Sequence, residues 1–325
     1  MRKTPLALAA TVAAVTLSLA ACSSGGSGGT TGGSTAGTTA GAGASAAPSG
    51  SSTFDPSTVA KDDTIAALLP DKVKSAGTLV VGSDTSYAPA EYLAEDGTTP
   101  IGYDIDLAKA IAGVLGLKAD IQSADFTGII PAIGSKYDVG ISSFTINPDR
   151  EKQVNMIEYF NAGEAYAVAA GNPQGITTDG APNNICGKSV GVQTGTVEDD
   201  ELTKSIIPAC TAAGKKAPNV VRHPAQSDVT TDLVGGKTDV MFADSPIIAY
   251  AVAQTNGQLQ QLGDVFESAP EGIVVSKDDQ ALTTAIQKAL VKLIDDGTYG
   301  KILTAWGNTT GAVTSDKVVV NPSVS

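Results

Sequence analysis

The stretch from Asp138 to Arg150 (DVGISSFTINPDR) begins as a run of apolar residues and ends in a cluster of hydrogen-bond donors. Ser142, Ser143 and Thr145 carry hydroxyl groups, and Arg150 carries a guanidinium whose planar fork of N–H donors matches a carboxylate. We interpret this cluster as a site for an anionic group. Arg150 taken alone is also compatible with an ordinary surface arginine.

A second group of polar residues comes later in the chain. Asp244 follows an apolar run and would accept hydrogen bonds from an ammonium group. Thr194, Thr196 and Val197 lie where a helix is expected to begin, and free N–H groups at a helix start favour an anion. A carboxylate clamp and an ammonium clamp together describe an α-amino acid. Asp244, which precedes Ser-Pro, is equally suited to capping a helix.

Three further residues stand at predicted element ends. Asp84 and Tyr87 follow the first predicted strand, and Phe126 begins a predicted helix. The two aromatic rings would give flat walls to a bound side chain. They are also ordinary core residues by type, and Asp84 could simply bind the backbone of its own turn.

The elements that would position these residues alternate between strands and helices. Strands are expected over 78–82, 118–122, 137–141, 189–192 and 220–222, and helices over 104–115, 126–133, 197–207 and 228–234. This order predicts an α/β fold with a mostly parallel sheet. In such sheets ligands bind beyond the carboxyl ends of the strands. Pro131 is expected to be tolerable in its helix only near the first turn.

One hexapeptide pattern occurs twice, which predicts two lobes built on one plan. Residues 134–139 read Gly-Ser-Lys-Tyr-Asp-Val, and residues 235–240 read Gly-Gly-Lys-Thr-Asp-Val. Both come after a predicted helix and lead into a strand. Five residues beyond each Asp stands a polar residue, Ser143 in the first copy and Asp244 in the second. If the lobes face each other, both rows of polar groups line one cleft.

The amino-terminal residues read as a secretory signal peptide. Arg2 and Lys3 form a basic start, and the apolar run that follows is too short to be a stable membrane span. The sequence Leu19-Ala-Ala-Cys22 is typical of a bacterial lipoprotein signal, which implies cleavage before Cys22 and attachment of lipid, such as palmitate, to its sulfur. An ordinary signal with a chance cysteine is the alternative. Residues 23–52 are uncharged and rich in Gly, Ser, Thr and Ala, which predicts a flexible tether.

Composition narrows the functional classes. The formal charge is −13, so nucleic acid is not an expected partner. Cys186 and Cys210 are the cysteines besides Cys22, and such a pair in an exported chain predicts a disulfide. His223 is the single histidine, so that a zinc site is not expected. Neither a metal nor another cofactor is predicted.

The chain resembles the family 3 extracellular solute-binding proteins, the amino-acid receptors of ABC importers, from about Leu69 to Trp306. The matching pieces are Gly82–Pro89 (GSDTSYAP), Ile101–Ile111 (IGYDIDLAKAI), Phe126–Ile133 (FTGIIPAI), Tyr137–Arg150, Val190–Thr196 (VGVQTGT) and Asp295–Tyr299 (DDGTY). The resemblance implies a type II periplasmic-binding-protein-like fold: two α/β lobes, a ligand cleft between them and a hinge of two strands.

The resemblance also implies a role for each clamp residue. Arg150 would bind the α-carboxylate, helped by Thr145 and by the N–H group of Val197. Asp244, Ser143 and Thr145 would hold the α-ammonium group. The family often has Thr or Ser where Val197 stands, so a side-chain hydroxyl is lost here while the N–H contact is kept.

The side chain of the ligand would lie between Tyr87 and Phe126, with Asp84 near its tip. Asp84 favours a polar or cationic side chain, although glutamate stays possible because Arg222 and Lys237 could reach the cleft. The family often has Phe after the proline of the first loop, where this chain has Ala90, which predicts a larger or differently shaped pocket.

The resemblance divides the chain as follows: signal peptide 1–21, lipidated cysteine and linker 22–53, helical extension 54–76, discontinuous first lobe 77–162 and 270–310, second lobe 163–269, and carboxyl-terminal tail 311–325. The hinge would cross near 161–164 and 266–272. The implied function is capture of a polar L-amino acid, basic ones included, and its delivery to a membrane permease.

The protein is expected to be a monomer anchored to the outer face of the cell membrane, and not an enzyme. The chain lacks a Gly-x-x-x-x-Gly-Lys-Ser/Thr motif, so the ATPase would be another chain. Two alternatives use the same fold. One is a dehydratase-like enzyme with Glu164 or Asp244 as acid or base, and the other is a ligand sensor that acts on a partner protein.

Overall fold

The computed structural model describes residues 53–177, 179 and 183–322. The signal peptide, Cys22 and the linker up to residue 52 lie outside the described residues.

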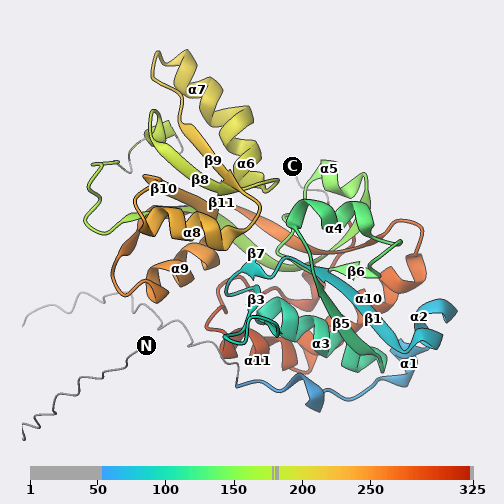
Figure 1. Cartoon of the computed structure of the whole chain (residues 1–325). Coiled ribbons are helices and arrows are strands. Elements are labelled where there is room, and N and C mark those ends of the chain that lie inside the picture. Colours follow the sequence, from blue (N-terminus) through green and yellow to red (C-terminus); the bar gives the residue numbers. More distant parts are fainter. Residues whose placement is uncertain (1–52, 178, 180–182, 323–325) are drawn as a thin grey trace, which may run out of the picture. The chain divides into compact units, whose positions relative to one another are not determined.

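An eight-stranded sheet in the order β5-β1-β6-β11-β7-β10-β8-β9 forms the scaffold (Figure 1). Its strands are β1 (Thr78–Ser83), β5 (Lys118–Ser123), β6 (Val139–Gly140), β7 (Val154–Ala169), β8 (Ser189–Gln193), β9 (Asn219–His223), β10 (Val240–Asp244) and β11 (Leu259–Ser276). A small second sheet joins β2 (Ser86–Tyr87), β3 (Glu91–Leu93) and β4 (Pro100–Ile101).

The sheet is parallel at its two ends and antiparallel in its middle. Strand β1 pairs in parallel with β5 and β6, and β8 does so with β9 and β10. The long strands β7 and β11 pair antiparallel with each other and with the neighbours β10 and β6. The prediction of a mostly parallel sheet is therefore wrong in the middle, because two return strands join the parallel ends there.

The helices cover the two ends of the sheet separately. Their bounds are α1 (Asp63–Ala66), α2 (Asp71–Ala76), α3 (Tyr103–Leu115), α4 (Phe126–Ala132), α5 (Pro148–Glu151), α6 (Val197–Glu201), α7 (Ile207–Ala212), α8 (Gln226–Val234), α9 (Ser245–Gln254), α10 (Gln280–Asp295) and α11 (Thr298–Ala305). We call β1, β5 and β6 with α3, α4, α5, α10 and α11 the first lobe, to which the loop of β2 to β4 also belongs. Strands β8 to β10 with α6 to α9 are the second lobe.

Local sequence explains the helix that anchors the first lobe. In α3 the apolar side chains of Ile105, Leu107 and Ile111 are fully buried, and Gly116 ends the helix in the left-handed conformation at φ +67°. This is the common use of glycine at a helix end. Helix α3 packs with α10 and α11 beside β1 and β5 (Figure 1).

The position of Pro131 differs from the prediction. It is the sixth residue of α4, in the last turn and not the first. Proline there removes the hydrogen bond to the carbonyl of Thr127, and the helix ends one residue later, so the loss falls where the helix already stops.

The apolar core does not divide cleanly between the lobes. The larger cluster includes Leu79, Ile111 and Leu290 of the first lobe and continues to Val229 and Ile248 of the second lobe. A smaller cluster, which includes Val190 and Phe242, belongs to the second lobe. The predicted disulfide between Cys186 and Cys210 is present, with 5.6 Å between the two Cα atoms. It ties the chain before β8 to α7.

The two copies of the repeated hexapeptide have the same structural role. Asp138 accepts a hydrogen bond from the N–H group of Val80 at 2.9 Å, and Asp239 accepts one from the N–H group of Ser189 at 2.8 Å. In both lobes the aspartate therefore holds the first strand beside the strand that follows the repeat.

Segments at both ends of the described chain pack on the first lobe. Before β1 lie α1, α2 and the short helix η1 (Pro56–Thr58). After α11 the chain forms bridges from Ala312 to Phe160 and from Val320 to Ile157, both in β7. The segment predicted as a tail is thus paired with a strand over part of its length. No helix among the described residues is both long and apolar enough to span a membrane.

Candidate ligand-binding site

The structure brings polar residues of both lobes together around one small cavity. It encloses about 260 Å³ between atoms, of which about 10 Å³ admits the centre of a water molecule. Nine residues singled out from the sequence line it: Asp84, Tyr87, Phe126, Ser143, Thr145, Arg150, Thr196, Val197 and Asp244.

Arg150 is buried at the centre of this arrangement, so it is not a surface arginine. Helix α5 carries it, and the Asn147 side chain caps that helix by accepting from the N–H group of Arg150 at 2.9 Å. The guanidinium lies over the rings of Phe126 and Phe144, which stack with centroids 4.9 Å apart. It donates to the carbonyl oxygen of Thr145 at 2.8 Å and to that of Gly195 in the second lobe at 3.2 Å.

The carboxylate of Asp84 is held mainly by its own lobe. It accepts hydrogen bonds from the N–H group and hydroxyl of Ser86 at 3.1 and 2.6 Å, and from the N–H group of Phe126 at 3.0 Å. A fourth donor, Nε2 of Gln193 in the second lobe, lies at 2.8 Å. Asp84 therefore lines the cavity and also binds turn backbone, so that both interpretations made from the sequence describe its geometry.

Of the two serines after β6, only one lines the cavity. The Ser142 hydroxyl donates to Glu91 at 2.7 Å and accepts from the N–H group of Asp84 at 3.0 Å, so its hydrogen bonds stay within the first lobe. Ser143 has φ +46°, a left-handed conformation that is uncommon for a residue with a Cβ atom. Its N–H group donates to Asp104 at 3.1 Å, and its buried Oγ has no hydrogen-bond partner within the described chain.

The loop before α6 supplies the second-lobe wall. Thr196 caps α6 by accepting from the N–H group of Asp199 at 3.3 Å, and Val197 is the first helical residue. The Thr194 hydroxyl points elsewhere, donating to the carbonyl oxygen of His223 at 3.2 Å, and Thr194 does not line the cavity.

Tyr87 and Asp244 join the lobes directly. The Tyr87 hydroxyl donates to Oδ2 of Asp244 at 2.7 Å. Asp244 stands at the cap position of α9, but its side chain makes no capping hydrogen bond there. A further bond between the lobes runs from the N–H group of Gln226 to the Ser86 hydroxyl at 3.0 Å.

Acidic groups dominate the electrostatics. Burial, followed by the charge of Glu198, raises the pKa of Asp244 well above its usual range. Burial also raises the pKa of Asp84, against the hydrogen bonds that stabilise its charged form. For Arg150, burial lowers the pKa while Glu198 and then Asp244 oppose that change. The site therefore gathers several carboxylates around one guanidinium, an environment in which cationic groups of a ligand are stabilised.

Two cavity residues, Gln193 and Glu198, were missed from the sequence. Gln193 ends β8 beside the predicted Thr194. Glu198 is the second residue of α6. The first turn of this helix was expected to bind an anion, and an acidic residue there is out of place, which was the available signal.

Three residues that were expected to affect the pocket lie outside its lining. Arg222 pairs with Asp199 at 2.7 Å, and Lys237 pairs with Asp232 at 2.7 Å. Ala90 is fully buried and also does not line the cavity, so the prediction that it reshapes the pocket wall is not supported.

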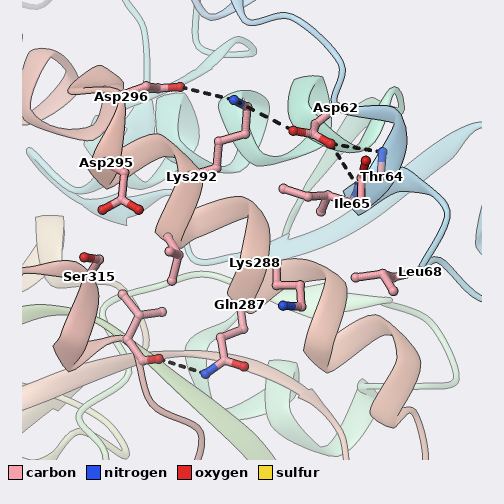
Figure 2. Close-up of a pocket in the computed structure, with 12 residues that line it drawn as sticks. Asp62, Thr64, Ile65, Leu68, Gln287, Lys288, Lys292, Asp295, Asp296 and Ser315 are labelled. Carbon is pink, nitrogen blue, oxygen red and sulfur yellow. Dashed lines mark hydrogen bonds and ion pairs between the residues drawn. The ribbon is translucent and has the colours of Figure 1, made fainter.

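A larger hollow of about 840 Å³ lies elsewhere in the first lobe, between α1, α10 and the short helix η4 (Ser315–Lys317) (Figure 2). Among its charged residues, Lys292 pairs with Asp62 at 3.8 Å and with Asp296 at 3.9 Å. It shares no residue with the cavity between the lobes. Among the residues that the structure describes, no group of three or more His, Cys, Asp or Glu could hold a metal ion.

Comparison with known proteins agrees with this architecture. The family model for bacterial extracellular solute-binding proteins, family 3, matches residues 79–309. The arginine-binding protein ArgT of Corynebacterium glutamicum is 32% identical over 258 residues, covering 79% of this chain and 82% of ArgT.

Two solved structures are similar over most of the described chain. An ancestral arginine-binding protein bound to arginine is 36% identical with a TM-score of 0.63, covering 71% of this chain and 98% of that one. The ancestral amino acid-binding protein AncCDT-1, a precursor of cyclohexadienyl dehydratase, is 30% identical with a TM-score of 0.65, covering 74% and 99%. The predicted two-lobed fold is confirmed, and the chain belongs to the bacterial extracellular solute-binding proteins, family 3.

Proposed function

We propose that this protein binds an α-amino acid in the cavity between its lobes and delivers it to the permease of an ABC importer. The observation that carries the proposal is that a buried guanidinium, Arg150, and a buried carboxylate, Asp244, line the same cavity from different lobes. They complement the two charges that every α-amino acid carries. The arginine-binding relatives support the ligand class.

In this proposal Arg150 binds the α-carboxylate of the ligand, with help from Thr145 and the N–H group of Val197. Asp244, Ser143 and Thr145 hold the α-ammonium group. The unpartnered Oγ of Ser143 fits this role, because a buried hydroxyl without a partner is otherwise costly.

The ligand side chain lies between Tyr87 and Phe126, with Asp84 at its tip. Because Asp84 is a buried carboxyl group at that position, a polar or basic side chain is favoured there. Ser142, Thr194 and Thr196 then support the walls through their hydrogen bonds to neighbouring residues.

Ligand entry requires the lobes to move apart. The free space for a water-sized body, about 10 Å³, is far smaller than an amino acid. We place the hinge at 161–164 and 266–272, within β7 and β11, where the pairing of these strands shifts register between Phe266 and Ala269 and between Glu271 and Gly272. The lobe boundaries at 77–162 with 270–310 and at 163–269 follow from that hinge.

We further propose that lipid on Cys22 anchors a monomeric protein at the outer face of the cell membrane, after cleavage of residues 1–21. Residues 22–53 then act as a tether, and the permease and a separate ATPase are the membrane partners. Replacing Cys22 by Ser should release the protein from the membrane fraction into the medium or periplasm. Retention of the variant in that fraction would contradict the anchor.

Binding without turnover is the proposed activity. The dehydratase alternative names Glu164 and Asp244, and burial raises the pKa of each, to about 11 for Glu164, which keeps the proton that a general acid must donate. Glu164 does not line the cavity, however, and Asp244 is already bonded to Tyr87. Loss of water from a bound organic acid during incubation would favour the enzyme.

The test is thermal melting of the soluble Cys22→Ser protein with each of the twenty amino acids, ornithine and citrulline. Ligand at 100 times Kd should stabilise the fold by about 2.7 kcal/mol, which raises the melting temperature by a few degrees. A shift with one chemical group of amino acids is expected. A folded protein whose melting temperature responds to none of them would refute the proposal.

A further inference from the structure

Glu198 is a buried carboxylate in the cavity that neither the sequence analysis nor the roles above assign. It is 1% exposed and lines the cavity together with Arg150 and Asp244. Within the described chain its Oε1 accepts no hydrogen bond, although it is buried. An acceptor in this state is costly to bury unless a ligand or solvent donor completes it.

The other two carboxylates of the cavity are better satisfied. Both oxygens of Asp84 accept two hydrogen bonds each, and Asp244 accepts the Tyr87 hydroxyl at 2.7 Å. Glu198 therefore holds acceptor capacity in the cavity that the protein itself leaves unused.

The charges of the cavity point to the kind of ligand that would use this capacity. Asp84, Glu198 and Asp244 are acidic, and Arg150 is the basic residue of the lining. A neutral amino acid adds no net charge and leaves the acidic excess in place. A basic amino acid reduces it by one, and an uncompensated buried charge is costly.

We propose that Glu198 is a specificity-determining residue, which favours a ligand with a positively charged side chain over a neutral ligand of the same shape. This inference rests on the proposed amino-acid-binding function. The charged groups that act on Glu198 are Arg150 from α5, Asp244 from β10, Glu164 from β7, Glu271 from β11 and Glu201 from its own helix. Arg150 attracts the Glu198 carboxylate, and the four acidic groups repel it, so that a cationic ligand is favoured nearby.

A merely structural role for Glu198 predicts something different. If Glu198 only supports α6 or tunes Arg150, its replacement changes the affinity for every amino acid by the same factor. Arginine and citrulline separate these cases, because they share shape and α-substituents and differ in the charge at the side-chain tip. The ratio of their Kd values cancels any common effect.

The experiment is calorimetric titration of the soluble C22S protein and of its E198Q form with arginine and with citrulline. The C22S protein with Glu198 should bind arginine more tightly than citrulline. E198Q should reduce the ratio of the two Kd values roughly tenfold, which is the size expected for a Coulomb interaction in a partly screened site. D200N is the matched control, since Asp200 is on the same helix but exposed and paired with Lys204. Its preference should stay within about twofold.

The possible outcomes distinguish a failure of the role of Glu198 from a failure of the proposed function. An unchanged ratio in E198Q, or a parent protein that does not prefer arginine, would overturn the role of Glu198 while amino-acid binding stands. A folded parent protein that binds no amino acid would instead refute the proposed function, and this inference with it. Should E198Q not fold, E198D is expected to keep the ratio and E198A to lose it; equal ratios in these two variants would also overturn the proposal.

Discussion

The first and second lobes hold their central strands alike but present opposite chemistry to the cavity. Asp138 and Asp239 make the same backbone hydrogen bond in the two copies of the repeat. Five residues further on, the first lobe presents Ser143 and the second presents Asp244. The scaffold thus repeats while the residues at its edge do not.

The difference extends to the rest of each wall. The first lobe contributes the guanidinium of Arg150, and most hydrogen bonds to its carboxylate Asp84 come from donors of the same lobe. The second lobe contributes Glu198 and Asp244. Asp244 accepts a hydrogen bond from Tyr87 of the first lobe, and Oε1 of Glu198 has no donor within the described chain. Two walls of opposite character can grip the two ends of a zwitterion, which two identical walls could not.

Removing the cation of the first wall should have the largest effect. Arg150→Met is expected to weaken amino-acid binding about 100-fold or more, because the partner of a buried charged group is lost. Lys152→Met is the matched control, since Lys152 is exposed and pairs with the exposed Asp149. Calorimetric titration with the best ligand measures both. An affinity of the Arg150 variant within a factor of five would show that the first wall does not hold the carboxylate.

The contact between the walls can be disturbed from the second lobe at Gly195. A Cβ atom there would stand 2.5 Å from Cγ2 of Thr127, and the residue has φ +81°. Gly195→Ala should therefore prevent full approach of the lobes and weaken binding roughly tenfold, the cost of overpacking a fitted contact.

Two further variants separate the clash from backbone strain. Gly214 has φ +68° with open space around its Cα, so Gly214→Ala should lower only the melting temperature. Adding Thr127→Ser to the Gly195 variant removes the clashing methyl group and should restore part of the affinity. Equal affinities in the Gly195 and Gly214 variants would mean that the lobes bind ligand without this close approach.

Sequence periodicity and turn chemistry located the strands and helices that precede each copy of the repeated hexapeptide, whereas α5, α10 and α11 were not predicted. Helix α3 was predicted one residue short, and β1 likewise. The antiparallel middle of the sheet was not predicted, because β7 and β11 pair over a separation that local patterns do not report. Helix α7 also continues beyond the predicted end at 207, to Ala212.

For the site, too, the sequence did not predict contacts between residues that are far apart in the chain. Residue types located the loops, but they could not say which hydroxyl turns inward. Ser142 is occupied by Glu91, which lies 51 residues away, whereas the adjacent Ser143 lines the cavity. Glu198 was missed because an acidic residue at a helix start usually serves the helix itself.

The acidic excess of the second lobe should appear as a pH dependence of stability. Burial, and then the nearby carboxyl of Glu201, raise the pKa of Glu164 from 4.5 to about 11. The folded state therefore holds this proton more tightly than the unfolded state, so the stabilisation is complete below pH 4.5 and is lost as the pH rises towards 11. The melting temperature should fall between pH 5 and pH 9, and less steeply in Glu164→Gln.

Glu95→Gln, a change at an exposed position of the first lobe, is the control for this slope. It should leave the pH dependence as it is in the parent protein. If Glu164→Gln and Glu95→Gln give the same slope, the pH dependence of stability does not come from Glu164.

The smallest effect is expected where the lobes are most alike. Asp138→Ala and Asp239→Ala each remove the acceptor of one backbone N–H group, at a cost of about 1–3 kcal/mol. Thermal melting should show a loss of a few degrees for each, while ligand affinity stays within about twofold, because neither aspartate lines the cavity. Asp278→Ala, at an exposed position, controls for the loss of charge. A large loss of affinity in only one of the two variants would mean that the two aspartates differ in function. One would then support ligand binding as well as the fold, and the other only the fold.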